Sequence, residues 1–145
     1  MSDERDLSAV ATPDDRTHLF KVREALLNLH KALLNVERAR YEQNVGPVAN
    51  EFEFFRLVTS DPSFAWINPM TTLIVQIDEQ VASKEPITVG AVEALYSETR
   101  AVLASTTGTP FQAEYNQLLQ ENPDLVMKHS AVMQALPPTE RTKQD

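Results

Sequence analysis

Residues 22–36, VREALLNLHKALLNV, decide the fold of this chain. Apolar residues recur there in alternating steps of four and three, the spacing of a helix that packs along a seam. They are Val22, Leu26, Leu29, Leu33 and Val36. A flanking stripe widens the apolar surface with Leu27, His30, Leu34, Glu37 and Tyr41. We therefore expect one long helix, from about Pro13 to Val45, that packs on more than one neighbour.

Five prolines follow a residue whose side chain can cap a helix. Proline has no amide hydrogen, so it fits the first helical position, and the preceding oxygen can accept from the free amides of that turn. The pairs are Thr12-Pro13, Asp61-Pro62, Asn68-Pro69, Thr109-Pro110 and Asn122-Pro123. With Gly46-Pro47 and Thr88, they predict further helices at 47–59, 69–83, from 89 onward, 110–121 and 123–136, and a short turn at 62–66.

These segments predict an all-α protein with one helical bundle, made of four principal helices and one or two short ones. In the helix expected at 47–59, the spacing places Val48, Phe52, Phe55 and Val58 on the inner face. The bundle domain is expected to cover residues 12–136. A flexible acidic segment is expected at 1–11 and a flexible tail at 137–145.

Composition limits the function classes. The 145 residues include no cysteine, which excludes disulfides, thiolate zinc sites and cysteine nucleophiles. The net charge of −8 disfavours nucleic acid as a partner, because an acidic chain repels the phosphate backbone. The first residues lack the pattern of a secretory signal, and no apolar run is long enough to span a bilayer. We expect a cytoplasmic protein with no membrane partner.

A metal site is one alternative for the polar residues on the apolar stripes. A bundle core that holds two histidines and two carboxylates can bind a divalent metal. The candidates are His30, Glu37, Asp78 and His129. However, the Glu-x-x-His motif of di-metal bundles is absent, since Leu27 and Val126 stand three residues before the histidines. The sequence therefore favours core hydrogen bonding for these groups, with no cofactor, over metal binding.

No catalytic residue is indicated. Acids one or two residues apart on a helix point in different directions and do not form an acid–base pair. Examples are Glu51 with Glu53 and Asp78 with Glu79. The three glycines stand too far apart for a phosphate-binding loop, and residues 105–107 lie in an expected loop with no general base suggested nearby. An enzyme is therefore less favoured than a binding protein.

Trp66, the only tryptophan, is a candidate for partner binding. It closes one end of the bundle in one interpretation and anchors a partner in the other, since tryptophan is enriched at interface centres. Leu27, Leu34 and Tyr41 are candidates for contact with a second copy across a two-fold axis. The partner is then the chain itself or another protein.

The centre of the chain resembles a group of small uncharacterised bacterial all-helical proteins. The resemblance rests on DPSFAWINP at residues 61–69, followed by LIV at 73–75 and IDE at 77–79. The run LHKALL at residues 29–34 fits it as well. It implies a bacterial cytoplasmic origin and a helical fold, and it carries no activity.

Three functions remain as hypotheses. The first is a non-enzymatic helical interaction or regulatory protein that forms a homodimer or binds another protein. The second is a bundle that binds a metal or a small molecule through His30, Glu37, Asp78 and His129. The third and weakest is a peripheral membrane or nucleic-acid adaptor that works through basic residues of the first helix, which lie around that helix rather than on one side. These residues are Arg16, Lys21, Arg23, Lys31, Arg38 and Arg40.

Overall fold

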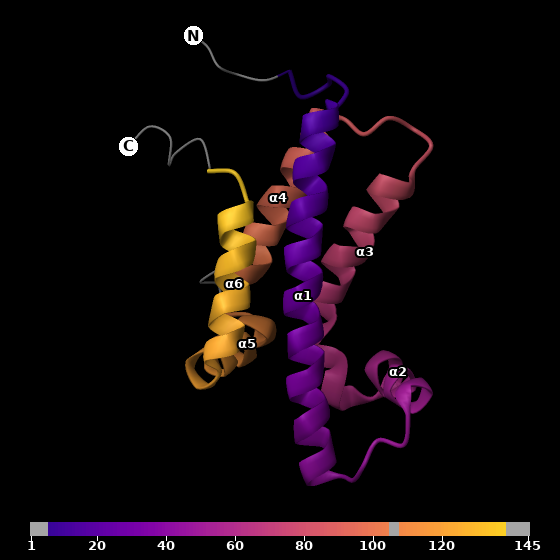
Figure 1. Cartoon of the computed structure of the whole chain (residues 1–145), viewed down its shortest axis with the longest axis vertical. Helices are drawn as coiled ribbons and strands as arrows, with labels where there is room; N and C mark the ends of the chain where they lie inside the picture. Colours follow the sequence, from indigo (N-terminus) through magenta and orange to yellow (C-terminus); the bar gives the residue numbers. More distant parts are fainter. Residues whose placement is uncertain (1–5, 105–107, 139–145) are drawn as a thin grey trace.

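The computed structural model describes residues 6–104 and 108–138. Within them the chain folds into six α-helices and one 3₁₀ helix, with no strand (Figure 1). The helices are α1 (Pro13–Asn44), α2 (Glu51–Ser60), η1 (Pro62–Ile67), α3 (Asn68–Ala82), α4 (Val89–Ala104), α5 (Pro110–Glu121) and α6 (Pro123–Ala135). The all-α prediction is confirmed. Residues 1–5 of the acidic segment expected to be flexible, the loop at 105–107 and residues 139–145 of the expected tail lie outside the described residues.

Three of the five expected caps are present. Thr12 and Asp15 form a reciprocal capping box at the start of α1, Asp61 accepts from the amide of Ser63, and Thr109 accepts from the amide of Gln112. The prediction is wrong for two asparagines. Asn68 is already helical because η1 runs directly into α3, and the Asn122 side chain instead donates to the Leu118 carbonyl at the end of α5.

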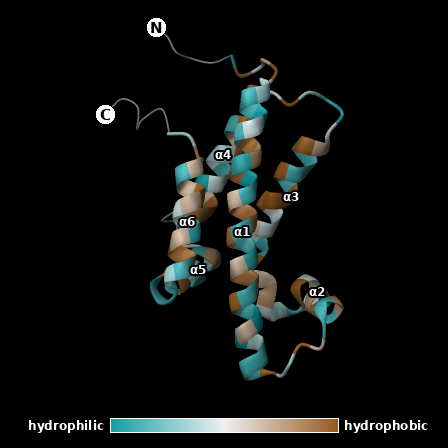
Figure 2. Ribbon diagram, in the orientation of Figure 1, coloured by the Kyte–Doolittle hydropathy of each residue, from teal (hydrophilic) through white to brown (hydrophobic). Residues whose placement is uncertain are grey.

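The long helix α1 is the axis of the fold and contacts α3, α4, α6 and η1 (Figure 1). Hydrophobic and hydrophilic residues alternate along its whole length (Figure 2). Its predicted seam is confirmed, since Val22, Leu26, Leu29 and Leu33 are fully buried. They belong to one large hydrophobic cluster, the main core, which takes residues from every helix except α2 and runs from Ala11 to Leu136. Burial of this continuous apolar surface supplies most of the stabilisation of the fold.

A second, smaller group of buried residues lies beside the C-terminal half of α1. This satellite cluster consists of Val48, Leu57 and Phe64, with Leu34, Tyr41, Phe54 and Val58 packed against it. The helix there begins at Glu51 rather than at the expected Pro47, because Asn50 accepts from the Glu53 amide and so forms the cap.

The expected inner face is confirmed for Val48 and Val58, which belong to or pack against the satellite cluster, and is wrong for the two phenylalanines. Phe52 is 77% exposed and Phe55 is 68% exposed. Leu57 fills the buried position instead, with Phe54 and Val58 at its sides. The helix has apolar residues on more than one face, and the structure covers only one of them.

Residues 7–11 lie along residues 87–90, where the chain enters α4. Val10 and Thr88 form an isolated antiparallel bridge, and backbone amides of Ala11, Val89 and Gly90 donate across the pair to Ile87, Ala9 and Leu7. The approach is close at Gly90, where a Cβ atom would lie 2.9 Å from the Leu7 carbonyl oxygen. The chain before α1 is thus attached to the domain from Leu7 onward. No helix in the described part of the chain is long and apolar enough to cross a bilayer.

Candidate functional site

Both histidines on the apolar stripes make hydrogen bonds between helices. The Nε2 atom of His30 on α1 lies 2.9 Å from the Thr71 hydroxyl on α3. The Nδ1 atom of His129 on α6 lies 2.7 Å from the Tyr115 hydroxyl on α5. Burial lowers the pKa of each histidine and raises that of Tyr115. Each ring therefore favours its neutral form and links two helices.

The two carboxylates also have partners from other helices. Glu37 is 7% exposed and accepts a hydrogen bond from the indole nitrogen of Trp66, at 2.9 Å. Arg40, which lies between Glu37 and Glu114, has its pKa raised chiefly by its hydrogen bond to Glu114. Asp78 on α3 pairs with Arg23 on α1.

The four metal candidates thus contact four different sets of residues. In the ranges 6–104 and 108–138, no group of three or more histidine and carboxylate side chains is placed to hold a metal ion. The metal site stays a prediction, and the observed contacts of its residues are those of interhelical hydrogen bonding. The partner of each histidine is a hydroxyl group of a neighbouring helix.

The basic residues of α1 are satisfied largely within the fold. Arg23 pairs with Asp78, Arg38 pairs with Glu42 and Glu51, and Arg40 pairs with Glu37 and Glu114. Three of the basic residues of α1 thus have acidic partners within the fold. These three arginines therefore do not form the continuous basic surface that the adaptor hypothesis needs.

The candidates for a dimer seam on α1 are packed inside the monomer. Leu27 and Leu34 are half-buried against the main core, and Leu34 also contacts the satellite cluster. Tyr41 packs against Phe64, with ring centroids 6.3 Å apart. These three side chains therefore present little free surface to a second copy.

Trp66 packs within the fold on one side and lines a cavity on the other. Its indole nitrogen is bound to Glu37, and its ring lies 5.7 Å from the ring of Phe111 on α5. The side chain remains half-buried because part of it lines an open cavity. The tryptophan is thus held in place on one side and accessible on the other.

We call this cavity of about 540 Å³ the Trp66 pocket. It lies where η1, α3, α4 and α5 meet, and most of its lining is apolar. The lining includes Trp66, Pro69, Ala101, Val102, Pro110 and Phe111. Glu98 is the one charged side chain among the described lining residues. A volume of this size and character is typical of a binding site for a small molecule or a large side chain.

Local structure explains how the pocket is built. The Asp61 cap starts η1 and brings Trp66 to the end of that short helix. The Thr109 cap starts α5 and places Phe111 in its first turn, where it stacks on Tyr115 at 5.2 Å. Because Ala65 and Ala101 are small, the space in front of the aromatic rings stays open. The sequence suggested Trp66, whereas Phe111 was expected only as a core residue.

A second hollow of about 350 Å³ continues from the Trp66 pocket. The two share Pro69, Glu98 and Val102 in their linings. The second hollow adds polar residues of α3, namely Asn68, Thr72 and Gln76. Glu98 therefore stands at the junction between the apolar Trp66 pocket and this second hollow, whose lining mixes apolar and polar residues.

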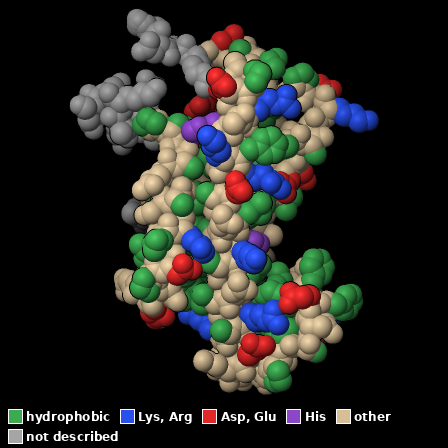
Figure 3. Space-filling view, viewed as in Figure 1, with side chains coloured by type: hydrophobic (Ala, Val, Ile, Leu, Met, Phe, Trp, Pro, Cys, Tyr) green, Lys and Arg blue, Asp and Glu red, His purple; other side chains and the backbone are tan. Residues whose placement is uncertain are grey.

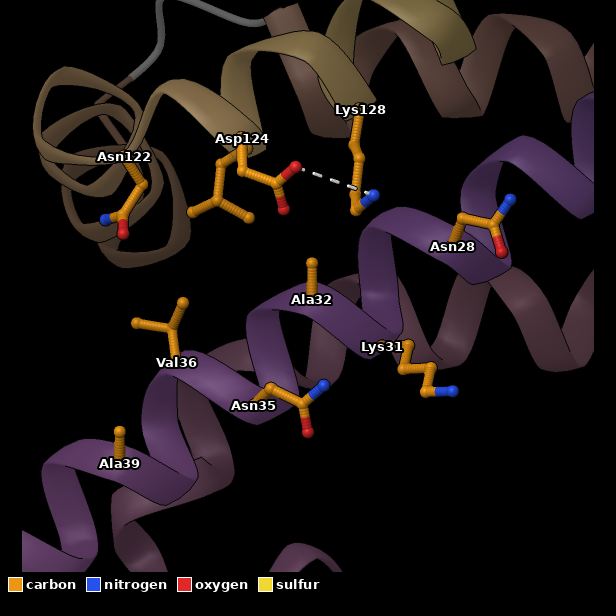
Figure 4. Close-up of a pocket in the computed structure, with 10 residues that line it drawn as sticks. Asn28, Lys31, Ala32, Asn35, Val36, Ala39, Asn122, Asp124 and Lys128 are labelled. Atoms are coloured by element: carbon orange, nitrogen blue, oxygen red, sulfur yellow. Dashed lines mark ion pairs between the residues drawn. The ribbon is translucent and has the colours of Figure 1, made fainter.

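A separate groove of about 560 Å³ lies between α1 and α6 (Figure 4). Ala32, Val36 and Ala39 form its floor on α1, and Lys128 extends toward α1 from α6. Lys128 pairs with Asp124 at 3.8 Å, a pair with an exposed carboxylate. The lining is mixed in charge, and its residues supply no buried polar group that points to a ligand.

The comparisons with known proteins add no relative. No family model, no curated protein and no solved structure matches this chain.

Proposed function

We propose that this protein is a non-enzymatic interaction protein that binds another protein through the Trp66 pocket. The observation that carries the proposal is the open apolar cavity beside a tryptophan fixed by its hydrogen bond to Glu37. A preformed pocket with a rigid aromatic wall binds a side chain at low entropic cost, since little has to be ordered on binding. Interface hot spots are built from such pockets and anchors.

The lining indicates the chemistry of the partner. The aromatic and proline walls suit a large apolar side chain, such as leucine, phenylalanine or methionine. Glu98 at the rim, on a chain of net charge −8, favours a basic residue next to that anchor. In the second hollow, beyond Glu98, the side chains of Asn68, Thr72 and Gln76 offer hydrogen-bonding groups to the backbone of the same segment. We therefore propose a partner segment in which an apolar residue neighbours lysine or arginine.

The lining also supports binding rather than catalysis. Acid–base catalysis needs a positioned proton donor or acceptor within reach of the substrate, commonly more than one group. Among the described lining residues, Glu98 is the one titratable side chain, and no nucleophile–base pair accompanies it. This favours the interaction protein over an enzyme.

Two coarser proposals accompany the first. The packing of α3, α4 and α6 around α1 supports classification as a single helical bundle. The acidic composition and the absence of cysteine support a cytoplasmic protein that binds neither nucleic acid nor membranes.

A displayed library of random peptides, selected on the purified protein, tests the function. We expect enrichment of peptides with an apolar residue beside a basic one. Their binding should change the fluorescence of Trp66, which is the only tryptophan in the chain. Enrichment of acidic peptides, or binding without any response of Trp66, would count against the pocket.

The small-molecule alternative is distinguished in the same experiment. A compound that occupies the pocket would change Trp66 fluorescence and compete with the selected peptides. The metal alternative predicts saturable binding of a divalent ion that is lost in both His30→Ala and His129→Ala. Titration with Zn²⁺ followed by calorimetry measures it.

A further inference from the structure

The polar side chains of the second hollow lie in one row on α3. They belong to Asn68, Thr72 and Gln76, which stand four residues apart. Residues at this spacing form a continuous ridge along the surface of a helix. With a rise of about 1.5 Å per residue, successive members of the row are about 6 Å apart along the helix. The row therefore forms one polar wall, about 12 Å long, that continues from the Trp66 pocket.

The fold does not use these three side chains. All three residues are exposed, and within residues 6–104 and 108–138 their side chains form no hydrogen bond. The neighbouring Thr71, by contrast, is bonded to His30 on α1. Side-chain amides donate as well as accept, and so does a hydroxyl group. The row thus keeps both donors and acceptors for another molecule.

An extended polypeptide has a repeat that matches this row. Its backbone rises about 3.3 Å per residue, and the N–H and C=O groups of every second residue point to the same edge. These groups therefore recur about every 6.6 Å, close to the spacing of the side chains on α3. In a helical segment the backbone groups are paired within the helix and would leave the row without partners. The spacing therefore favours an extended occupant.

The apolar part of the second hollow fits the same occupant. Leu73 is 1% exposed and lies at the base of the hollow. Pro69 and Val102 line both cavities and connect this base with the Trp66 pocket. Successive side chains of an extended chain point alternately into a groove and out of it. A segment whose backbone follows the row on α3 can therefore place an apolar side chain in the Trp66 pocket.

Glu98 is an uncompensated charge in this groove. On the face formed by α1, acidic and basic side chains are interspersed (Figure 3), and Arg23, Arg38 and Arg40 have ion pairs there. Glu98 is exposed and, in the part of the chain that the structure describes, has neither an ion pair nor a hydrogen bond. Charge complementarity therefore favours a basic segment as the occupant over an acidic one.

We propose that the Trp66 pocket and the second hollow together bind a basic partner segment in an extended conformation, with its backbone hydrogen-bonded to Asn68, Thr72 and Gln76. This inference rests on the function proposed for the pocket and specifies the conformation of the partner. The row on α3 spans about four extended residues. Backbone bonds of this kind supply affinity, whereas the pocket and Glu98 select the side chains. The partner motif should then lie in an unstructured segment rather than in an amphipathic helix.

Variants of the row test the hydrogen bonds. Thr72→Val and Gln76→Leu nearly preserve side-chain size and remove the donors and acceptors, so each should weaken binding of a selected peptide roughly two- to tenfold. Gln80→Leu is the matched control, because Gln80 lies on the same helix but lines a different cavity with residues of α1. It should bind as the wild type does. Titration followed by Trp66 fluorescence measures the affinity, and circular dichroism shows whether each variant is folded.

Methylation of successive backbone nitrogens in the selected peptide tests the extended conformation. Each methyl group removes one donor, so the affinity should fall at every second position after the anchor residue and change little at the positions between them. A version of the peptide held in a helix by a side-chain cross-link should bind more weakly than the linear peptide.

The outcomes separate this inference from the function on which it rests. Unchanged affinity of folded Thr72→Val and Gln76→Leu, with a normal Trp66 response, would overturn the role of the row and leave the pocket as the binding site. An equal loss in Gln80→Leu would also overturn it. Tighter binding of the cross-linked peptide would overturn the extended conformation. If no selected peptide changed Trp66 fluorescence, the proposed function would fail and this inference with it.

Discussion

The main core and the satellite cluster are built from the same kinds of residues but differ in how many helices cover them. The main core receives side chains from α1, α3, α4, α5 and α6, so its central residues are enclosed on every side. The satellite cluster rests on one short helix, the end of α1 and Phe64 of η1. In the main core Leu29 and Ile77 are fully buried, whereas α2 keeps Phe52 and Phe55 in solvent.

The difference shows that burial depends on the number of neighbours as well as on the apolar pattern of a helix. The 3₁₀ helix η1 joins the two regions, because Phe64 packs in the satellite cluster and Ile67 packs in the main core. The main core carries the Trp66 pocket at its surface, and this pocket suits the binding of a partner side chain.

The largest effect is expected in the main core. Leu29→Ala should lower the free energy of unfolding by about 2–5 kcal/mol, since it leaves a cavity that surrounding helices cannot close. Urea denaturation measures the change. A loss below about 1 kcal/mol would contradict the enclosed core.

Leu57→Ala should have a smaller effect on global stability, about 1–2 kcal/mol, because α2 can separate while the main core stays folded. Hydrogen exchange should accelerate in α2 and remain unchanged in α1. Equal acceleration in both helices would show that the two regions unfold as one unit.

The link through Trp66 tests how firmly η1 is joined to α1. Trp66→Phe keeps an aromatic ring but removes the donor to the buried Glu37, and should cost about 1–3 kcal/mol. Glu37→Gln and the double variant complete a mutant cycle. We expect a coupling energy of about 1 kcal/mol between the two positions, and additivity would argue against the bond.

The effect of pH on the free energy of unfolding should be smaller, and it should arise from His30 and His129. Burial lowers the folded-state pKa values of His30 and His129, so the unfolded chain binds protons first as the pH falls. The free energy of unfolding is therefore at its full value above about pH 6.5 and decreases as the pH falls through the lowered folded values.

Urea denaturation at two pH values, about 7.5 and about 5.5, measures this dependence. His30→Gln and His129→Gln should each reduce the difference in the free energy of unfolding between these two pH values. Wild-type stability that rises on acidification would contradict the sign.

Much of the fold was predictable because its signals are local. The Thr12 and Thr109 caps, each followed by proline, fixed the starts of α1 and α5. The spacing of Leu26, Leu29 and Leu33 identified the seam of α1. Asn122 has the same form as the other caps and fails, because its amide has a closer acceptor in the preceding helix.

The outer face of α2 and the full Trp66 pocket were not predictable. Periodicity shows that Phe52 and Phe55 are apolar and share a face, but it does not show which faces find a neighbour. The pocket needs Trp66 and Phe111, which are distant in sequence and meet only through the packing of η1 on α5. The single tryptophan was a usable signal for a binding site, whereas nothing in the sequence marked Glu98 as a lining residue of the pocket.

The most direct test of the proposed function is to fill the Trp66 pocket from one side. Ala101 lines the pocket from α4, so Ala101→Phe should occupy the cavity without disturbing the buried core. Ala94→Phe, at an exposed position of the same helix, is the matched control. Calorimetric titration with a peptide selected on the wild type should show binding at least tenfold weaker for Ala101→Phe, about 1.4 kcal/mol, and unchanged for Ala94→Phe. Equal affinity for all three proteins would contradict the assignment of the pocket as the binding site.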